Sequence, residues 1–114
     1  MANWKEILGG EGQMVGTLWK EHPDLGAAFS QLQKANFKEK VLSVKQKEHI
    51  AVALAIAARC DGCIAHHINA AIKAGCTREE LVEVAGVAIL MGGGPSNYYA
   101  SKALQAFDEF TAEA

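Results

Sequence analysis

The sequence lacks an apolar segment long enough to cross a membrane, and it has no strong excess of charge of either sign. Its longest apolar run covers residues 50–58, whereas a helix that spans a bilayer needs about 20 such residues. It contains 11 Lys and Arg against 13 Asp and Glu, which gives a formal net charge of −2. We therefore expect neither a membrane protein nor a basic surface that binds nucleic acid.

The chain also has few cysteines, and its first residues do not resemble a secretory signal. The opening MANWKEILGGEGQ has no apolar segment behind a basic start. Three cysteines, an odd number, do not suit a framework of structural disulfides. We therefore expect a cytoplasmic protein. In that reducing compartment, two cysteines close in sequence are more often catalytic or metal-binding than structural.

Proline and alternating strand patterns are scarce, and helical periodicity occupies most of the chain instead. A globular composition, 50% hydrophobic over 114 residues, predicts a single domain, residues 1–114. We predict an all-α bundle of six or seven helices. The expected helical segments are 4–8, 13–21, 23–35, 43–59, about 60–74, 77–91 and 95–110.

Two capping boxes and three glycine positions set several of these boundaries. Ser43-x-x-Gln46 and Thr77-x-x-Glu80 each match the pattern that opens a helix. The Gly9-Gly10 pair should end the first segment. Gly75 suits the position just after a helix. A further break is expected at Asp61-Gly62, because glycine is a poor residue for the interior of a helix.

The alanine-rich segment 50–58 is apolar nearly all round, so we place it at the centre of the bundle. So much apolar helix in a short chain also suggests that another subunit covers some faces. We therefore expect a homo-oligomer. The GGGP stretch at residues 92–95 lacks the phosphate-loop pattern and is interpreted as a helix break. For Tyr98 and Tyr99, packing in the core is favoured over a role in a pocket or interface.

The most informative residues are Cys60, Cys63 and His67. On a helix that begins near Cys60, these three positions fall within a sector of about 60°. His66 points about 100° away from His67 and lies off this stripe. A helix N-terminus favours a thiolate, and an imidazole can take up or pass on its proton. Two such cysteines can alternate between dithiol and disulfide while an external reductant resets them.

Glu48 is the other polar residue of interest. On one straight helix it would lie about 120° from Cys60 and outside the stripe. If the chain turns at Asp61-Gly62 and the two helices pack together, Glu48 can face the cysteines from the opposite side. It is then a candidate to pass protons through His67 or a water molecule.

Two other interpretations of these residues stay open. Cys60, Cys63 and His67 could provide three zinc ligands, with Cys76, Glu48 or water as the fourth. Ligands from one helix surround a tetrahedral ion poorly, however. The cysteines could also be inert buried residues. Cys76 itself is expected to be a small buried hydrophobic residue.

The pattern Glu48-x11-Cys60-x-x-Cys63-x3-His67 resembles the alkylhydroperoxidase D and carboxymuconolactone decarboxylase superfamily. The resemblance covers about residues 40–110, including the segment from Asn69 to Phe110 with its glycine-rich break. It implies an all-α fold, assembly as a trimer or hexamer, and reduction of organic hydroperoxides. No cofactor is expected, because a dithiol or a thioredoxin-like protein would supply the electrons.

By the same resemblance, Cys63 attacks the peroxide, Cys60 resolves the product, and Glu48 and His67 relay protons. The decarboxylases of the superfamily generally lack the cysteine pair, which favours the redox branch. The carboxylate of Asp61 departs from this picture, because it would oppose thiolate formation unless it pointed to solvent. The alternatives are a lyase or isomerase acting on a small lactone acid, and a zinc-stabilised helical interaction module.

Overall fold

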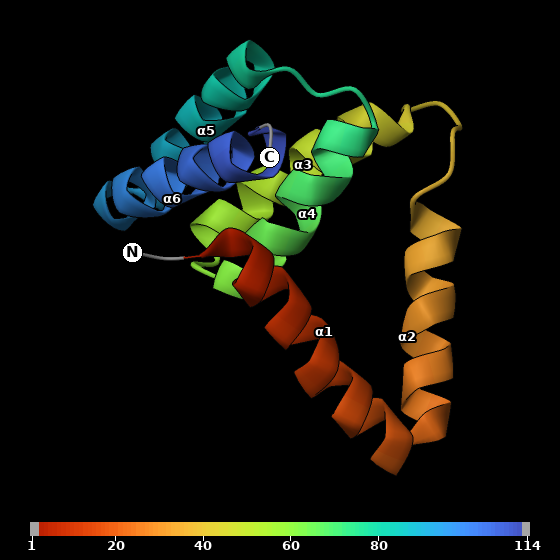
Figure 1. The fold of residues 1–114 in the computed structure, drawn as a ribbon. Coiled ribbons are helices and arrows are strands. Elements are labelled where there is room, and N and C mark those ends of the chain that lie inside the picture. The colour runs from red at the N-terminus through yellow and green to blue at the C-terminus, as the bar shows by residue number, and fades with distance from the viewer. Residues whose placement is uncertain (1–2, 113–114) are drawn as a thin grey trace.

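The computed structural model describes residues 3–112, which form helices joined by short connections (Figure 1). The described residues contain no strand, and the predicted all-α class is confirmed. No helix in this part of the chain is both long and apolar enough to cross a bilayer. The six helices are α1 (Trp4–Glu21), α2 (Pro23–Asn36), α3 (Val44–Ala57), α4 (Asp61–Lys73), α5 (Arg78–Gly92) and α6 (Gly94–Thr111).

The core lies among the last four helices. The central helix α3 packs against α4, α5 and α6, as its apolar character predicted. Small alanines from all four helices let the backbones approach closely, and larger aliphatic side chains fill the space between them. The fully buried large side chains here are Val52, Ile56, Ile64, Ile68 and Leu81. This core holds α3 and α4 side by side, and the site described below depends on that arrangement.

Helices α1 and α2 form an arm that projects from this core (Figure 1). The arm is anchored at its start by Trp4, which is fully buried and donates its indole N–H to Gln105 at 3.0 Å. At the tip, Gly26 allows α2 to pack closely on Trp19, since a Cβ at position 26 would lie 2.8 Å from that side chain. Within the described residues, α1 is the one helix that α2 contacts, and the two helices meet at the tip and diverge from it (Figure 1).

Both predicted capping boxes are present. The Ser43 hydroxyl accepts from Gln46 N–H at 3.0 Å, and the Gln46 side chain accepts from Ser43 N–H at 2.8 Å. Thr77 and Glu80 make the same reciprocal pair at 3.1 and 2.8 Å. These local signals therefore placed the starts of α3 and α5 correctly.

The break predicted at Gly9-Gly10 is wrong, because α1 continues through both residues as a single helix. Two glycines cost a helix about 2 kcal/mol relative to alanine. The contacts of α1 with α4 and α6 near its start, and with α2 near its end, offset this cost. Residues 3–112 consequently form six helices, the lower of the two expected numbers.

The turn between α3 and α4 lies slightly earlier than expected. It is centred on Arg59, whose φ of 58° makes it the one non-glycine residue with a positive φ in the described chain. The Cys60 N–H donates back to the Ala55 carbonyl at 3.2 Å and closes the turn. Asp61 and Gly62 are already in the first turn of α4. The expected glycine after α4 is present, with Gly75 at φ 95°.

Candidate functional site

The two cysteines lie at the start of α4 and form a disulfide. Cys60 is the N-cap residue, and its sulfur accepts the backbone N–H of Cys63 at 3.1 Å. Their Cα atoms are 5.2 Å apart. Cys63 is exposed, whereas Cys60 is half-buried. When the disulfide is reduced, the N–H and the positive end of the helix would stabilise a thiolate on Cys60.

Glu48 and His67 form a hydrogen-bonded pair near the cysteines. Because the chain reverses at Arg59, α3 runs along α4, and a Glu48 carboxylate oxygen lies 2.8 Å from His67 Nδ1. Glu48 is buried, with 6% of its surface exposed. The ring of Phe37 stacks on His67 at a centroid distance of 5.6 Å. With Nδ1 donating to the carboxylate, Nε2 is free to exchange a proton.

His66 lies closer to the site than its predicted helix direction suggested. Its ring contacts the edge of His67 at a centroid distance of 4.8 Å. Burial and the neighbouring His67 lower the pKa of His66 below its usual value. His66 is itself exposed, and as a neutral imidazole it can act as a second proton acceptor at the same place.

A cavity of about 790 Å³ opens in front of Cys63, His66 and His67. It lies between the arm and α4, and most of its walls are apolar. A volume of this size is typical of a site for a small molecule. Glu11 and Gln33 are its other polar side chains. The apolar lining consists of Leu8, Val15, Leu18, Trp19, Leu25 and Phe29, together with Gly12 and Gly16.

Lys102 neutralises Asp61, the acidic residue that appeared unfavourable next to the cysteines. Its ammonium lies 2.8 and 3.0 Å from the two carboxylate oxygens. It also lies over the ring of Tyr99, 4.8 Å from the centroid, and over the ring of Tyr98 at 5.2 Å. The hydrogen bond to Asp61 raises the pKa of Lys102. The core position favoured for Tyr98 is wrong, since 64% of this residue is exposed.

Sequence reasoning missed Lys102 and Phe37. Lys102 is 41 residues from its partner Asp61, and no local pattern links the two positions. Phe37 is the residue after α2, between the predicted helical segments 23–35 and 43–59. An aromatic residue in a polar connection was the one available signal that Phe37 packs against something.

Cys76 lies beyond the other end of α4 and is buried, as expected, with 7% exposure. Burial raises the pKa of its thiol. The helix between Cys60 and Cys76 is about 20 Å long at 1.5 Å per residue. Cys76 therefore cannot complete a metal site with Cys60 and Cys63, which are joined to each other in this structure.

The sequence is similar to one protein family and to several individual proteins. Residues 23–106 match the carboxymuconolactone decarboxylase family. An uncharacterized protein of Cupriavidus necator is 43% identical over 100 residues, which cover 88% of each chain. A protein of the Paracoccus denitrificans cox locus, also uncharacterized, is 38% identical over 82 residues, covering 72% of this chain and 74% of the relative.

A crystal structure matches over nearly the whole chain. It is the apo form of a carboxymuconolactone decarboxylase family protein from Legionella pneumophila. The two chains are 44% identical and superpose with a TM-score of 0.92, over 96% of this chain and 97% of the other. Taken together with the match to residues 23–106, these similarities mean that the chain belongs to the carboxymuconolactone decarboxylase family.

Proposed function

We propose that this protein is a thiol-dependent peroxidase that reduces organic hydroperoxides through Cys60 and Cys63. The proposal depends on how the two cysteines, His67 and Glu48 are arranged. An exposed cysteine, already paired with its neighbour, lies on the first turn of α4, and His67 follows it by one helical turn with Glu48 behind the imidazole. This arrangement provides a nucleophile, a resolving thiol and a proton relay in one place.

In the first step the Cys63 thiolate attacks the terminal oxygen of the hydroperoxide. An S–O bond forms and the O–O bond breaks, so that Cys63 becomes a sulfenic acid. The departing alkoxide takes a proton from His67 and leaves as an alcohol. Cys63 suits this role because it is exposed and lines the cavity.

In the second step the Cys60 thiolate attacks the sulfur of Cys63. The S–S bond forms and the S–O bond breaks. The leaving hydroxide takes the proton that the Cys60 thiol gave up, by way of His67, and departs as water. The Cys63 N–H, 3.1 Å from the Cys60 sulfur, favours the thiolate needed for this attack. A dithiol or a thioredoxin-like donor then reduces the disulfide and is itself oxidised. The cycle requires no cofactor, and a reducing cytoplasm would supply such a donor.

The size and apolar walls of the cavity suit an organic hydroperoxide better than hydrogen peroxide. Its walls are mostly apolar, and its volume of about 790 Å³ is far larger than hydrogen peroxide needs. An apolar alkyl group would gain roughly 25 cal/mol for each Å² of surface removed from water. The proposal therefore includes faster reaction with a bulky organic hydroperoxide than with hydrogen peroxide.

We further propose that the active form is a homo-oligomer, a trimer or a hexamer. The arm exposes several apolar side chains: Leu25 and Phe29 line the cavity, Leu32 on α2 is 57% exposed, and Met14 on α1 is 71% exposed. A second copy that packs against the arm would bury these side chains and cover the opening of the cavity. Light scattering should give a mass of three or six chains, and Leu32→Glu should reduce it. A monomer at micromolar concentration would contradict this part of the proposal.

The proposed chemistry is tested by counting thiols in reduced protein before and after addition of tert-butyl hydroperoxide. Two of the three thiols per chain should disappear and return with dithiothreitol, while Cys76 remains as an internal reference. Cys63→Ser should lose dithiol-dependent hydroperoxide consumption. Cys60→Ser should stop at a sulfenic acid that dimedone traps. Unchanged thiols in the wild type, or full activity in Cys63→Ser, would rule out the mechanism.

A lyase acting on a small lactone acid is the second candidate. It is favoured by the Glu48–His67 pair, whose contact does not involve either cysteine. Acid–base chemistry by this pair would survive replacement of both Cys60 and Cys63 by alanine. Turnover of such a lactone acid by that double variant would support the lyase and argue against the peroxidase.

A further inference from the structure

A second group of side chains suited to chemistry lies away from the cysteine pair. His49 of α3, Cys76 of the loop before α5, and Glu80 of α5 bring a ring nitrogen, a sulfur and a carboxylate oxygen within 4.8 Å of one another. We propose that these three residues, the Cys76 site, bind a transition-metal ion of the zinc type. Water would be the fourth ligand. The inference does not depend on the proposed peroxidase activity.

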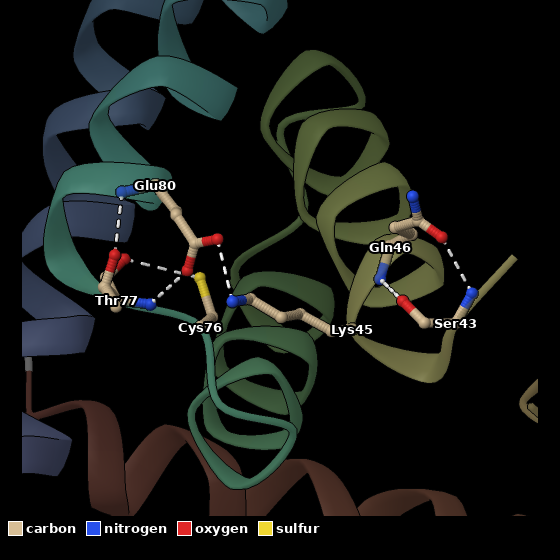
Figure 2. Close-up of polar contacts among 6 residues, drawn as sticks. All are labelled: Ser43, Lys45, Gln46, Cys76, Thr77 and Glu80. Atoms are coloured by element: carbon tan, nitrogen blue, oxygen red, sulfur yellow. Dashed lines mark hydrogen bonds and ion pairs between the residues drawn. The ribbon is translucent and has the colours of Figure 1, made fainter.

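The backbone already holds two of these ligands in place. Gly75, at φ 95°, turns the chain after α4, and the Cys76 N–H donates to the Ala71 carbonyl at 2.9 Å. The capping box fixes Glu80, whose carboxylate accepts the Thr77 N–H at 2.8 Å. Figure 2 shows the Cys76 sulfur next to this carboxylate. These contacts therefore fix the backbone of Cys76 and one oxygen of Glu80 before an ion binds.

His49 has an unsatisfied nitrogen. Its Nε2 atom is closed off from solvent and has no hydrogen-bond partner among the described residues. Buried ring nitrogens are ordinarily hydrogen-bonded or bound to a metal. This unpaired nitrogen is an observation separate from the clustering, and a metal ion bound through Nε2 would satisfy it.

The spacing and the origin of the ligands suit a four-coordinate ion. Bond lengths of about 2.3 Å to sulfur and 2.0 Å to nitrogen separate tetrahedral ligands by about 3.5 Å. The present spread of no more than 4.8 Å therefore has to contract by about 1 Å, a change that side-chain rotations can supply. Cys60, Cys63 and His67 all lie at or near the start of α4, whereas His49, Cys76 and Glu80 come from two helices and a loop and can surround an ion.

A positive charge already occupies the open side of the site. The Lys45 ammonium lies 2.8 Å from the Glu80 oxygen that the capping box does not use, and both side chains are about one-third exposed (Figure 2). A metal ion would replace this ammonium on the carboxylate and keep the capping box intact. Lys45 would then turn to solvent and leave a path for water and for the incoming ion.

The donor set also predicts which ions bind and how pH acts. Sulfur and imidazole select zinc, cobalt or similar ions over magnesium and calcium, which require oxygen ligands. A cysteine binds such an ion as the thiolate, so binding releases the thiol proton and the affinity should increase with pH.

The experiment uses the full chain in its disulfide form, so that Cys76 is its one remaining thiol. Cobalt serves as the probe, because a Cys76 thiolate bound to Co²⁺ gives a sulfur-to-metal charge-transfer absorption. Zinc is then titrated in by competition and by calorimetry in two buffers of different ionisation enthalpy. We expect one ion per chain, the charge-transfer band, and release of one proton.

Three variants and a control define the site. Cys76→Ala should abolish the charge-transfer band. Glu80→Gln keeps the capping-box pattern but loses the charge of a direct ligand, and it should weaken binding by at least about a hundredfold, the largest loss typical of an outer-shell partner. Lys45→Met removes the competing ammonium and should tighten binding severalfold. The adjacent exposed carboxylate provides the control, since Glu79→Gln should match the wild type within twofold.

The variants also distinguish specific binding at the Cys76 site from nonspecific attraction of the ion to exposed carboxylates. If Cys76→Ala does not fold, Glu80→Gln and Lys45→Met still test the site, because both positions are partly exposed. Absence of the charge-transfer band in the wild type at saturating cobalt would overturn the proposal. Equal weakening by Glu79→Gln and Glu80→Gln, or weaker binding in Lys45→Met, would overturn it as well. None of these outcomes bears on peroxide reduction, which the thiol titration tests separately.

Discussion

Glu48→Gln is expected to slow the oxidation of the reduced cysteines by hydroperoxide about tenfold while leaving the fold intact. Glutamine has the same shape as the buried glutamate and can still accept the N–H of His67, which lies 2.8 Å away. What it loses is the negative charge that stabilises the imidazole when it carries a second proton.

The magnitude follows from the hydrogen bond itself. A hydrogen bond to a charged group contributes about 1.5–3 kcal/mol, against about 1 kcal/mol for a neutral pair. The variant therefore forfeits about 0.5–2 kcal/mol in the transition state, and each 1.36 kcal/mol is a factor of about ten in rate. The expected range is thus about two- to thirtyfold, with tenfold near its centre.

The assay is the rate of thiol loss in reduced protein with excess tert-butyl hydroperoxide. Glu83→Gln, at an exposed position of α5, is the matched control and should react like the wild type. Because Glu48 acts through His67, its effect should largely vanish in a His67→Asn background. If Glu48→Gln reacts at the wild-type rate, or slows His67→Asn by the same factor as the wild type, the two side chains do not act as a relay.

Three further predictions concern stability. Arg59→Gly should raise the urea midpoint, because the left-handed conformation at φ 58° costs an L-residue about 1–2 kcal/mol; a lower midpoint would mean that the Arg59 side chain contributes more. Trp4→Ala should cost about 3–5 kcal/mol of unfolding free energy, followed by circular dichroism, whereas a loss under 1 kcal/mol would contradict its role as anchor of the arm. Pairing with Lys45 lowers the pKa of Glu80 from 4.5 to about 2. Its stabilisation should be complete above pH 4.5 and lost as the pH falls towards 2, so Glu80→Gln should melt with less acid dependence than Glu79→Gln; identical profiles would refute this.

Local sequence signals predicted helix starts correctly where the side chain of a single N-cap residue fixes the first turn. Ser43 and Thr77 satisfy N–H groups of the next turn with their own side chains, so their effect does not depend on distant packing. Gly9-Gly10 failed as a signal for the opposite reason. A glycine only lowers helix propensity, and contacts along α1 with other helices decide the outcome.

The arrangement of the site could be predicted only in part. Helix geometry placed Cys63 and His67 on one stripe, and Glu48 could reach them once a turn was assumed. The position of that turn at Arg59 was not predictable from propensity, because arginine rarely adopts a positive φ.

Contacts between distant residues were out of reach for the sequence alone. The pairing of Asp61 with Lys102 joins two helices, and nothing in the order of residues specifies it. The same holds for His49, Cys76 and Glu80, which come from two helices and a loop. Cys76 carried the one visible signal of that cluster, and it was interpreted correctly as buried, although burial alone does not reveal its neighbours.

The arm formed by α1 and α2 should unfold locally more easily than the core formed by the other helices. Since α2 contacts α1 near the tip and contacts no other helix of the described chain, its backbone amides should exchange with solvent through local unfolding. Exchange in α3 and α4 should require global unfolding instead. In an oligomer that covers the arm, protection of α2 would rise with protein concentration. Helix α2, which forms one wall of the cavity, is therefore the least stable part of the site. Assembly of an oligomer would control both the order of α2 and the access of substrate to Cys63.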